Sequence, residues 1–224
     1  MAMTMARSTW AGLASLGAVH AIVDGSCAAM AFSLIGRRGG LDASVWHWIV
    51  AYNMIAFGSQ SLLGLATDRW RAPRLVAALG CGVTAAGVMA FGFSPIPALC
   101  VAGVGNALFH AGGGCISLHY APGKAAAPGL FVAPGAVGLA LGTIAGTSGY
   151  FTDWIFALLL GASCLAIGLM GMPRIDYRRP PVETPRGHLL LVLTLLLICI
   201  GIRSLVGLTN VFPWKTDTLP LLAL

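Results

Sequence analysis

The sequence predicts an all-α polytopic membrane protein. Its 224 residues are 58% hydrophobic and only 9% charged, whereas soluble domains carry about 25% charged residues. Apolar segments recur along the chain, each near the length of about 20 residues that crosses the hydrocarbon core of a membrane. The 30 glycines fit the same class, because small residues let transmembrane helices approach one another closely.

Apolar lengths and polar interruptions divide the chain into seven expected spans. We expect helices at 10–35, 44–67, 75–93, 97–120, 127–147, 154–172 and 188–212. The domains predicted from these spans are an N-terminal six-helix bundle at 1–172, a cytoplasmic linker at 173–187 and the start of a second bundle at 188–224.

The basic residues of the loops predict the orientation. On the side of the N-terminus the segments carry Arg7, Arg69, Arg71, Arg74, Lys124, Arg174, Arg178, Arg179 and Arg186. The other side carries Arg37, Arg38 and Lys215. By the positive-inside rule the N-terminus is cytoplasmic, and we expect an integral protein of a bacterial inner membrane, in contact with its lipid bilayer. The net charge of +6 then reflects these loops, and no nucleic-acid partner is expected.

A charged stretch, Gly-Leu-Ala-Thr-Asp-Arg-Trp-Arg-Ala-Pro-Arg, separates the second and third expected spans. Such a cluster is too costly to place in hydrocarbon, so it indicates a tight turn at a membrane surface. There a carboxylate can accept backbone N–H bonds from a helix N-terminus and pair with arginines. Alternatively, the stretch is a solvated loop that only fixes the topology.

This stretch resembles the signature loop between helices 2 and 3 of the major facilitator superfamily of secondary transporters. The family usually has glycine where Arg71 stands. The resemblance implies a gating motif, in which the acid latches two halves of the transporter together in the outward-facing state. Its members here would be Gly64, Asp68, Arg69, Arg71 and Arg74.

Six spans followed by a basic linker are also the layout of one half of such a transporter, and its halves are related as repeats. The sequence stops at Leu224, just where an eighth helix could begin. We therefore expect a truncated chain or fragment: a major-facilitator-type six-helix N-terminal bundle plus helix 7.

The first span carries His20 and Asp24, which are spaced i, i+4 and share one helix face. Both fall near the middle of the span, where ionisable groups usually face a cavity or a partner. A histidine beside a carboxylate can bind and release protons near neutral pH. The pair is thus a candidate proton site, or alternatively a hydrogen-bonded pair that holds the helix to its neighbours.

The fourth span places Asn106 and His110 on one face in the same way, among glycines that let a helix or a ligand approach the backbone. The segment resembles the fosmidomycin-resistance branch of the superfamily, which has a phenylalanine-histidine-proline-glutamate run here. Phe109 and His110 match that run, whereas Ala111 and Gly112 replace the proline and the acid. We expect Asn106 and His110 to line a cavity.

The fifth span holds Gly138, Gly142 and Gly146, which form overlapping G-x-x-x-G contacts along one face. The pair Gly123-Lys124 ahead of this span is similar to the same branch, and in the superfamily a glycine-rich helix 5 is associated with antiporters. Plain close packing of helices is the alternative explanation.

Further polar residues complete the expected pathway. Arg203 lies about midway through the seventh span, where a permanently charged guanidinium needs an acid or an anionic ligand unless it reaches the interface. The fosmidomycin-resistance branch has a similar Arg-Ser pair early in this helix. Asn53 and Gln60 are seven residues apart in the second span. They either line the pathway or bond neighbouring helices.

Motifs of other function classes are missing from the sequence. It contains no phosphate loop, no His-Glu-x-x-His and no Gly-x-Ser-x-Gly motif, so no enzyme is predicted. The cysteines are scattered through apolar segments in a pattern that suits neither disulfides nor zinc. We expect no metal and no cofactor.

The sequence therefore predicts proton-coupled efflux of a small organic molecule by alternating access. Three alternatives remain: a non-transporting membrane scaffold or sensor, an inactive truncated fragment, and a half-transporter that acts as a dimer. A missing C-terminal half or a second copy of the chain would be the protein partner.

Overall fold

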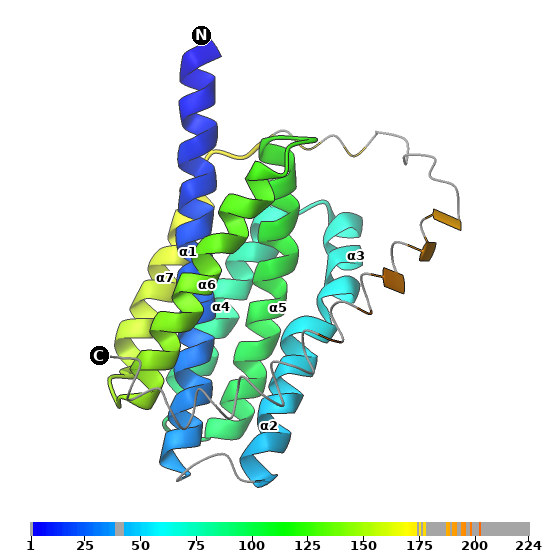
Figure 1. Cartoon of the computed structure of the whole chain (residues 1–224). Coiled ribbons are helices and arrows are strands. Elements are labelled where there is room, and N and C mark those ends of the chain that lie inside the picture. The colour runs from blue at the N-terminus through cyan, green and yellow to red at the C-terminus, as the bar shows by residue number, and fades with distance from the viewer. Residues whose placement is uncertain are drawn as a thin grey trace. The chain divides into compact units, whose positions relative to one another are not determined.

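The computed structural model of the chain describes residues 2–38, 43–173, 175, 177, 187, 188, 190, 191, 194, 195, 198 and 202. The chain divides into two compact units, Met1–Ile175 and Asp176–Leu224. All named elements belong to the first unit, and no strand occurs among the described residues. The elements are α1 (Ala2–Arg37), α2 (Ala43–Asn53), the π-helix η1 (Met54–Gly58), α3 (Gln60–Trp70), α4 (Pro73–Ala90), α5 (Pro95–Tyr120), α6 (Ala126–Thr147) and α7 (Asp153–Leu169) (Figure 1).

Five helical segments are long and apolar enough to cross a membrane: Trp10–Arg37, Val45–Trp70, Pro73–Ala90, Pro95–Tyr120 and Ala126–Thr147. The apolar helix α7 is shorter, at 17 residues. These helices indicate an integral membrane protein with an all-helical fold. Each of the six spans expected before residue 173 overlaps helix, although the expected ends at 93 and 172 lie three residues beyond the ends of α4 and α7. The expected linker and seventh span lie largely outside the described residues, and the major-facilitator arrangement stays a prediction.

Prolines define where two of the spans begin. Pro73 and Pro95 each stand in the first turn of their helix, α4 and α5. Proline has no N–H to donate, and the first helical turn leaves its N–H groups without intrahelical acceptors, so the residue is tolerated there. These prolines therefore mark the helix starts, and the connections before them span only 71–72 and 91–94.

The second span is not one continuous α-helix, because η1 separates α2 from α3. Side chains compete for backbone carbonyls on both sides of it: Asn53 donates to the Ile49 carbonyl at 2.8 Å, and Gln60 donates to the Ala56 carbonyl at 2.9 Å. Ser59 donates in the same way, four residues back. Thr84 and Ser163 make the same bond to a carbonyl four residues back inside unbroken α-helices, so these bonds accompany η1 without explaining it.

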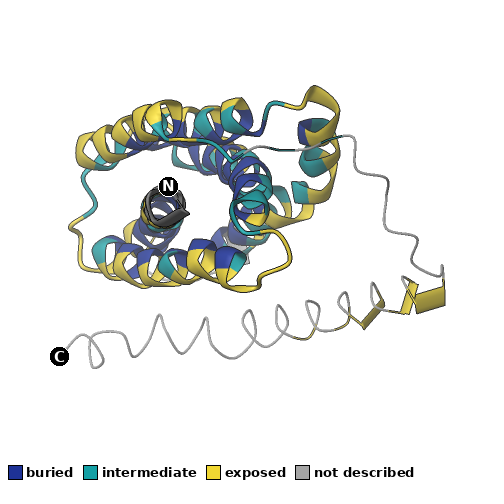
Figure 2. Cartoon of the chain, turned by 90° about the horizontal axis from the view of Figure 1, so that it is seen from above, coloured by how far each residue is buried: buried dark blue, intermediate teal, exposed yellow. Residues whose placement is uncertain are grey.

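Helix α1 is the most buried span, and it lies between other helices of the unit (Figure 2). It contacts α2, α4, α5, α6 and α7. Its closest neighbour is α6, and the two backbones touch along a row of glycines. A Cβ added at Gly138 would collide with the Ala21 carbonyl, and one at Gly142 with the Gly25 carbonyl. The glycine row of the fifth span thus serves close packing against α1, the alternative considered for it above.

Helix α5 packs on α4 in the same manner. A Cβ at Gly105 or at Gly112 would meet the α4 backbone, at Thr84 and Ala77 respectively. One face of α5 is therefore fixed against α4, and the face carrying Asn106 and His110 is turned toward α1, as their contacts with Asp24 show.

Candidate functional site

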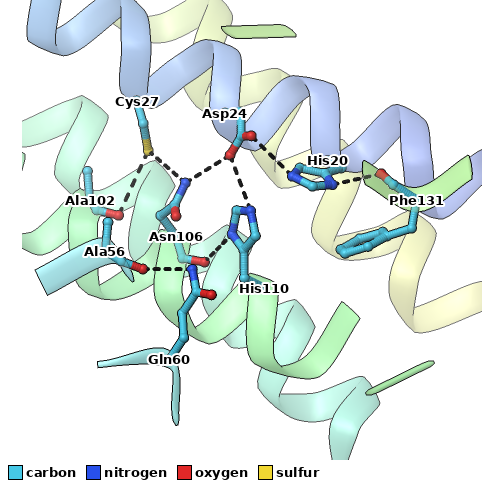
Figure 3. A network of polar contacts seen from close by, with 9 residues as sticks. All are labelled: His20, Asp24, Cys27, Ala56, Gln60, Ala102, Asn106, His110 and Phe131. Carbon is cyan, nitrogen blue, oxygen red and sulfur yellow. Dashed lines mark hydrogen bonds and ion pairs between the residues drawn. The ribbon is translucent and has the colours of Figure 1, made fainter. Parts of the chain in front are cut away.

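Three titratable side chains meet between α1 and α5, and Asp24 is the central one (Figure 3). One carboxylate oxygen, Oδ2, lies 3.1 Å from His20 Nε2, one helical turn away on α1. The other, Oδ1, lies 3.6 Å from His110 Nε2 on α5. The i, i+4 spacing predicted the first contact, and the packing of α1 on α5 supplies the second.

Asn106 supports the same carboxylate from α5. Its side-chain Nδ2 donates a hydrogen bond to Asp24 Oδ1 at 3.0 Å. Asn106 is 1% exposed, and its Oδ1 is buried without a hydrogen-bond partner among the described residues. An unpaired buried acceptor is costly, so this oxygen is available to a donor that enters the site.

The cluster lies in an apolar frame, and its members differ in exposure. His20 is 3% exposed, whereas His110 and Asp24 are 16% and 18% exposed. The His20 ring contacts the rings of Phe109 and Phe131. An ion in such surroundings is expensive unless paired, so the three groups depend on one another.

The second nitrogen of each imidazole is fixed by a backbone carbonyl. His20 Nδ1 lies 2.7 Å from the Phe131 carbonyl of α6, and His110 Nδ1 lies 2.9 Å from the Asn106 carbonyl. A carbonyl oxygen only accepts, so both Nδ1 atoms carry the hydrogen. If both rings are neutral, each Nε2 presents only a lone pair to the Asp24 carboxylate. No hydrogen then lies between either Nε2 and the carboxylate oxygen that it faces. The arrangement calls for a cation at its centre, of which the proton is the smallest.

Gly135 of α6 makes room for this arrangement. A Cβ at this position would lie 2.5 Å from His20 Nε2 and 2.6 Å from its Cδ2. Any larger residue would therefore push the imidazole away from Asp24. Gly135 was not singled out from the sequence among the glycines of this span.

Cys27, which was not singled out from the sequence among the scattered cysteines, is a neighbour of the cluster. Its Sγ lies 3.8 Å from Asn106 Nδ2 and 3.9 Å from the Ala102 carbonyl. His20, Asp24 and Cys27 are spaced i, i+4 and i+7 on α1, which places all three on one face. That spacing was the signal that could have found it.

Asn53 and Gln60 are bound to their own helix backbone by the hydrogen bonds that flank η1. No contact of either with Asp24 or the histidines is recorded among the described residues. The spacing of seven assumes continuous α-helix, and η1 interrupts it between these two positions. Their assignment to a pathway stays a prediction.

The charged turn of the expected gating motif lies at the other end of α3. Asp68 and Arg69 are exposed in its last turn, and Arg71 ends the helix in the left-handed conformation, with φ 53°. That backbone favours glycine, which is the residue the family usually has there. Arg74 begins α4 and donates from its guanidinium to the Met170 carbonyl, past the end of α7, at 2.6 Å.

A Cβ on Gly64 would meet nothing within 4 Å. The turn lies at the end of the bundle where α1 begins, as does the turn that contains Lys124 (Figure 1). This agrees with the alternation of spans assumed for the loop charges, and the side of the membrane stays a prediction. Arg203 lies outside the described residues.

Comparisons with known proteins leave the family open. No family model, no curated protein and no solved structure matches the chain.

Proposed function

We propose that the chain acts in a secondary active transporter of the major facilitator type, which exports a small organic molecule in exchange for protons. The observation that carries the proposal is the Asp24 carboxylate held between two imidazoles, at 3.1 and 3.6 Å. Such groups inside an apolar span mark an ion or substrate pathway by default.

Position supports this proposal as well as chemistry. Asp24 is near the midpoint of Trp10–Arg37, and Asn106 and His110 are near the midpoint of Pro95–Tyr120. Transporters bind their substrates and coupling ions near the bilayer midplane. In the proposed mechanism, loading the cluster with a proton biases which side of the protein is open.

The proposal needs a second bundle, either a C-terminal half or a second copy of the chain. Asp68 and the arginines of its turn would secure the closed inner gate against that bundle, and Arg203 would hold an anionic substrate group or pair with Asp24. The left-handed Arg71 supports the resemblance of this turn to the signature loop. The N-terminus would face the cytoplasm of a bacterial cell.

The test uses liposomes that contain the protein and an imposed pH gradient. Transport of each member of a panel of small organic ions across the liposome membrane is measured. We expect flux in the wild type and its loss in Asp24→Asn and His110→Ala. His119→Ala is the matched control: it lies on the same helix, with Nδ1 bonded four residues back to Cys115 at 2.7 Å.

Unchanged gradient-driven flux in Asp24→Asn and His110→Ala would rule out the proposed mechanism. A wild-type protein that carries no flux, either alone or with a supplied C-terminal half, would favour a membrane scaffold or sensor.

A further inference from the structure

The same three side chains also have the composition of a metal site. His20, Asp24 and His110 each offer one ligand atom, and these atoms all lie within 4.8 Å of one another. We propose that the cluster binds one divalent transition-metal ion of the zinc class. The proposal goes beyond the transport function, because binding is measured on the resting protein.

The distances fit a small tetrahedral ion. Zinc bonds to imidazole nitrogen and carboxylate oxygen measure about 2.0–2.2 Å, so neighbouring ligand atoms lie about 3.3–3.6 Å apart. The two recorded separations from the Asp24 oxygens to the histidine Nε2 atoms, 3.1 and 3.6 Å, bracket this range. The two distances run to different oxygens of the carboxylate, and one ligand atom from each residue lies within 4.8 Å of the others, so side-chain rotations would be needed to close the three ligands around one ion.

The hydrogen bonds around the cluster are those of a metal site. Metal-binding histidines almost always donate the other ring N–H to a carbonyl or carboxylate, which fixes the tautomer and aims the free nitrogen at the ion. Both histidines do so here, to the carbonyls of Phe131 and Asn106. The carboxylate is held in turn by the Asn106 side chain at 3.0 Å.

Three protein ligands leave a fourth position open. Catalytic zinc sites differ from structural ones in keeping such a position for water or substrate. Asp24 and His110 are the partly exposed members of the cluster, so this position faces their side. A water bound to the ion there would be a donor, and Asn106 Oδ1 is a buried acceptor that lacks one.

Ligand chemistry narrows the class of ion. Magnesium and calcium prefer all-oxygen shells, whereas two imidazoles and a carboxylate suit zinc, cobalt(II), nickel(II) and iron(II). No metal was predicted from the sequence, because the cysteines are scattered. Cysteine spacing carries no information about a site formed by histidines of two helices.

The test is a zinc titration of the full chain in detergent, purified with an affinity tag that contains no histidine and stripped with a chelator. We expect one ion per chain. His110→Ala and Asp24→Ala should weaken binding by more than the roughly 10–100-fold that loss of a supporting group costs. Asn106→Ala should fall within that range, and His119→Ala should bind as the wild type does.

Cobalt(II) gives an independent readout, because a tetrahedral site produces a much stronger visible spectrum than an octahedral one. We expect the tetrahedral spectrum in the wild type and its loss in His110→Gln, which keeps a polar side chain of similar size. Thermal unfolding without metal identifies the variants that are folded.

The proposal is overturned if the wild type shows no saturable zinc binding, or if folded His110→Gln binds zinc as tightly as the wild type. An octahedral cobalt spectrum would also overturn it. None of these three results bears on gradient-driven flux, so the transport proposal stands or falls separately.

Discussion

Two regions of the bundle differ sharply in burial. One is the contact between α1 and α6, and the other is the segment from α2 through η1 to α3. In the first span, 78% of the most apolar window is buried, against 17% in Val45–Trp70. Glycines bring the backbones of α1 and α6 into direct contact. Large apolar side chains of the other segment are exposed, among them Met54, Phe57, Leu62 and Leu65.

The same bundle thus contains a close-packed backbone contact and a helical segment that is exposed and interrupted. Backbone contact leaves no slack, because interiors are close-packed and respond to a single added methyl group. A π-turn, by contrast, interrupts the helical ladder and often marks a functional site. His20 and Asp24 belong to the tightly packed helix, and the Phe57 ring of η1 lies 6.4 Å from the His110 ring. The candidate site is therefore where the two regions meet.

The largest effect of a single substitution should come from filling the contact between α1 and α6. Gly142→Leu places a side chain where even a Cβ collides with the Gly25 carbonyl. We expect a loss of at least about 3 kcal/mol, at or above the upper end of ordinary overpacking. Unfolding in mixed detergent micelles measures it.

The matched control is Gly82→Leu in α4, where a Cβ would meet nothing within 4 Å. It should stay within about 1 kcal/mol of the wild type, the scale of glycine's helix propensity. Equal destabilisation by both variants would remove the distinction between tight and open helix surfaces.

A smaller change in the same region should affect the site alone. Gly135→Ala adds one methyl group that collides with the His20 ring. The imidazole must move, and its aim at Asp24 is lost. We expect zinc binding about 10–100-fold weaker, as for loss of a supporting group, in a protein that still folds. Wild-type affinity in this variant would contradict the role assigned to Gly135.

The turn after α3 should respond through its backbone. Arg71 has φ 53°, and left-handed backbone costs L-residues about 1–2 kcal/mol. Arg71→Gly and Arg71→Ala remove the same guanidinium, so their difference isolates the conformation. We expect the glycine variant to be more stable by about 1 kcal/mol. Equal melting temperatures would mean that the turn relaxes in the alanine variant.

The smallest effect on stability should follow from deleting Phe57, an exposed residue of η1. Removing one residue from a π-turn allows the i, i+4 ladder to close, so we expect a change below about 1 kcal/mol. Deleting the exposed Leu141 of α6 is the contrast, because it turns Gly142 and Gly146 by about 100° out of contact with α1. That variant should not fold. Folding of both would show that α6 tolerates a shift of register.

The helices were predictable because the lengths of the apolar segments can be read from the sequence. Pro73 and Pro95 mark the beginnings of two of them. The interruption at η1 was not predictable, because hydropathy does not register it and the side-chain bonds of Asn53, Ser59 and Gln60 beside it also occur in unbroken helices.

The candidate site was predictable only within each helix. The i, i+4 spacings placed His20 with Asp24, and Asn106 with His110. That the two pairs face each other depends on the rotation of α5, which is set by Gly105 and Gly112 against α4. Such crossings involve the backbones of helices distant in sequence, so a local pattern does not contain them.

The carbonyl bonds of the two histidines determine which routes through the cluster are closed. Both Nδ1–H groups are already donated, to Phe131 and to Asn106, so neither ring can pass a proton from one nitrogen to the other without breaking its tether. Any cation, proton or metal, arrives at and departs from the same Nε2 face. The cluster is therefore a binding site with one accessible face and not a proton-conducting chain. A protein that uses it to move charge must expose that face to each side of the membrane in turn.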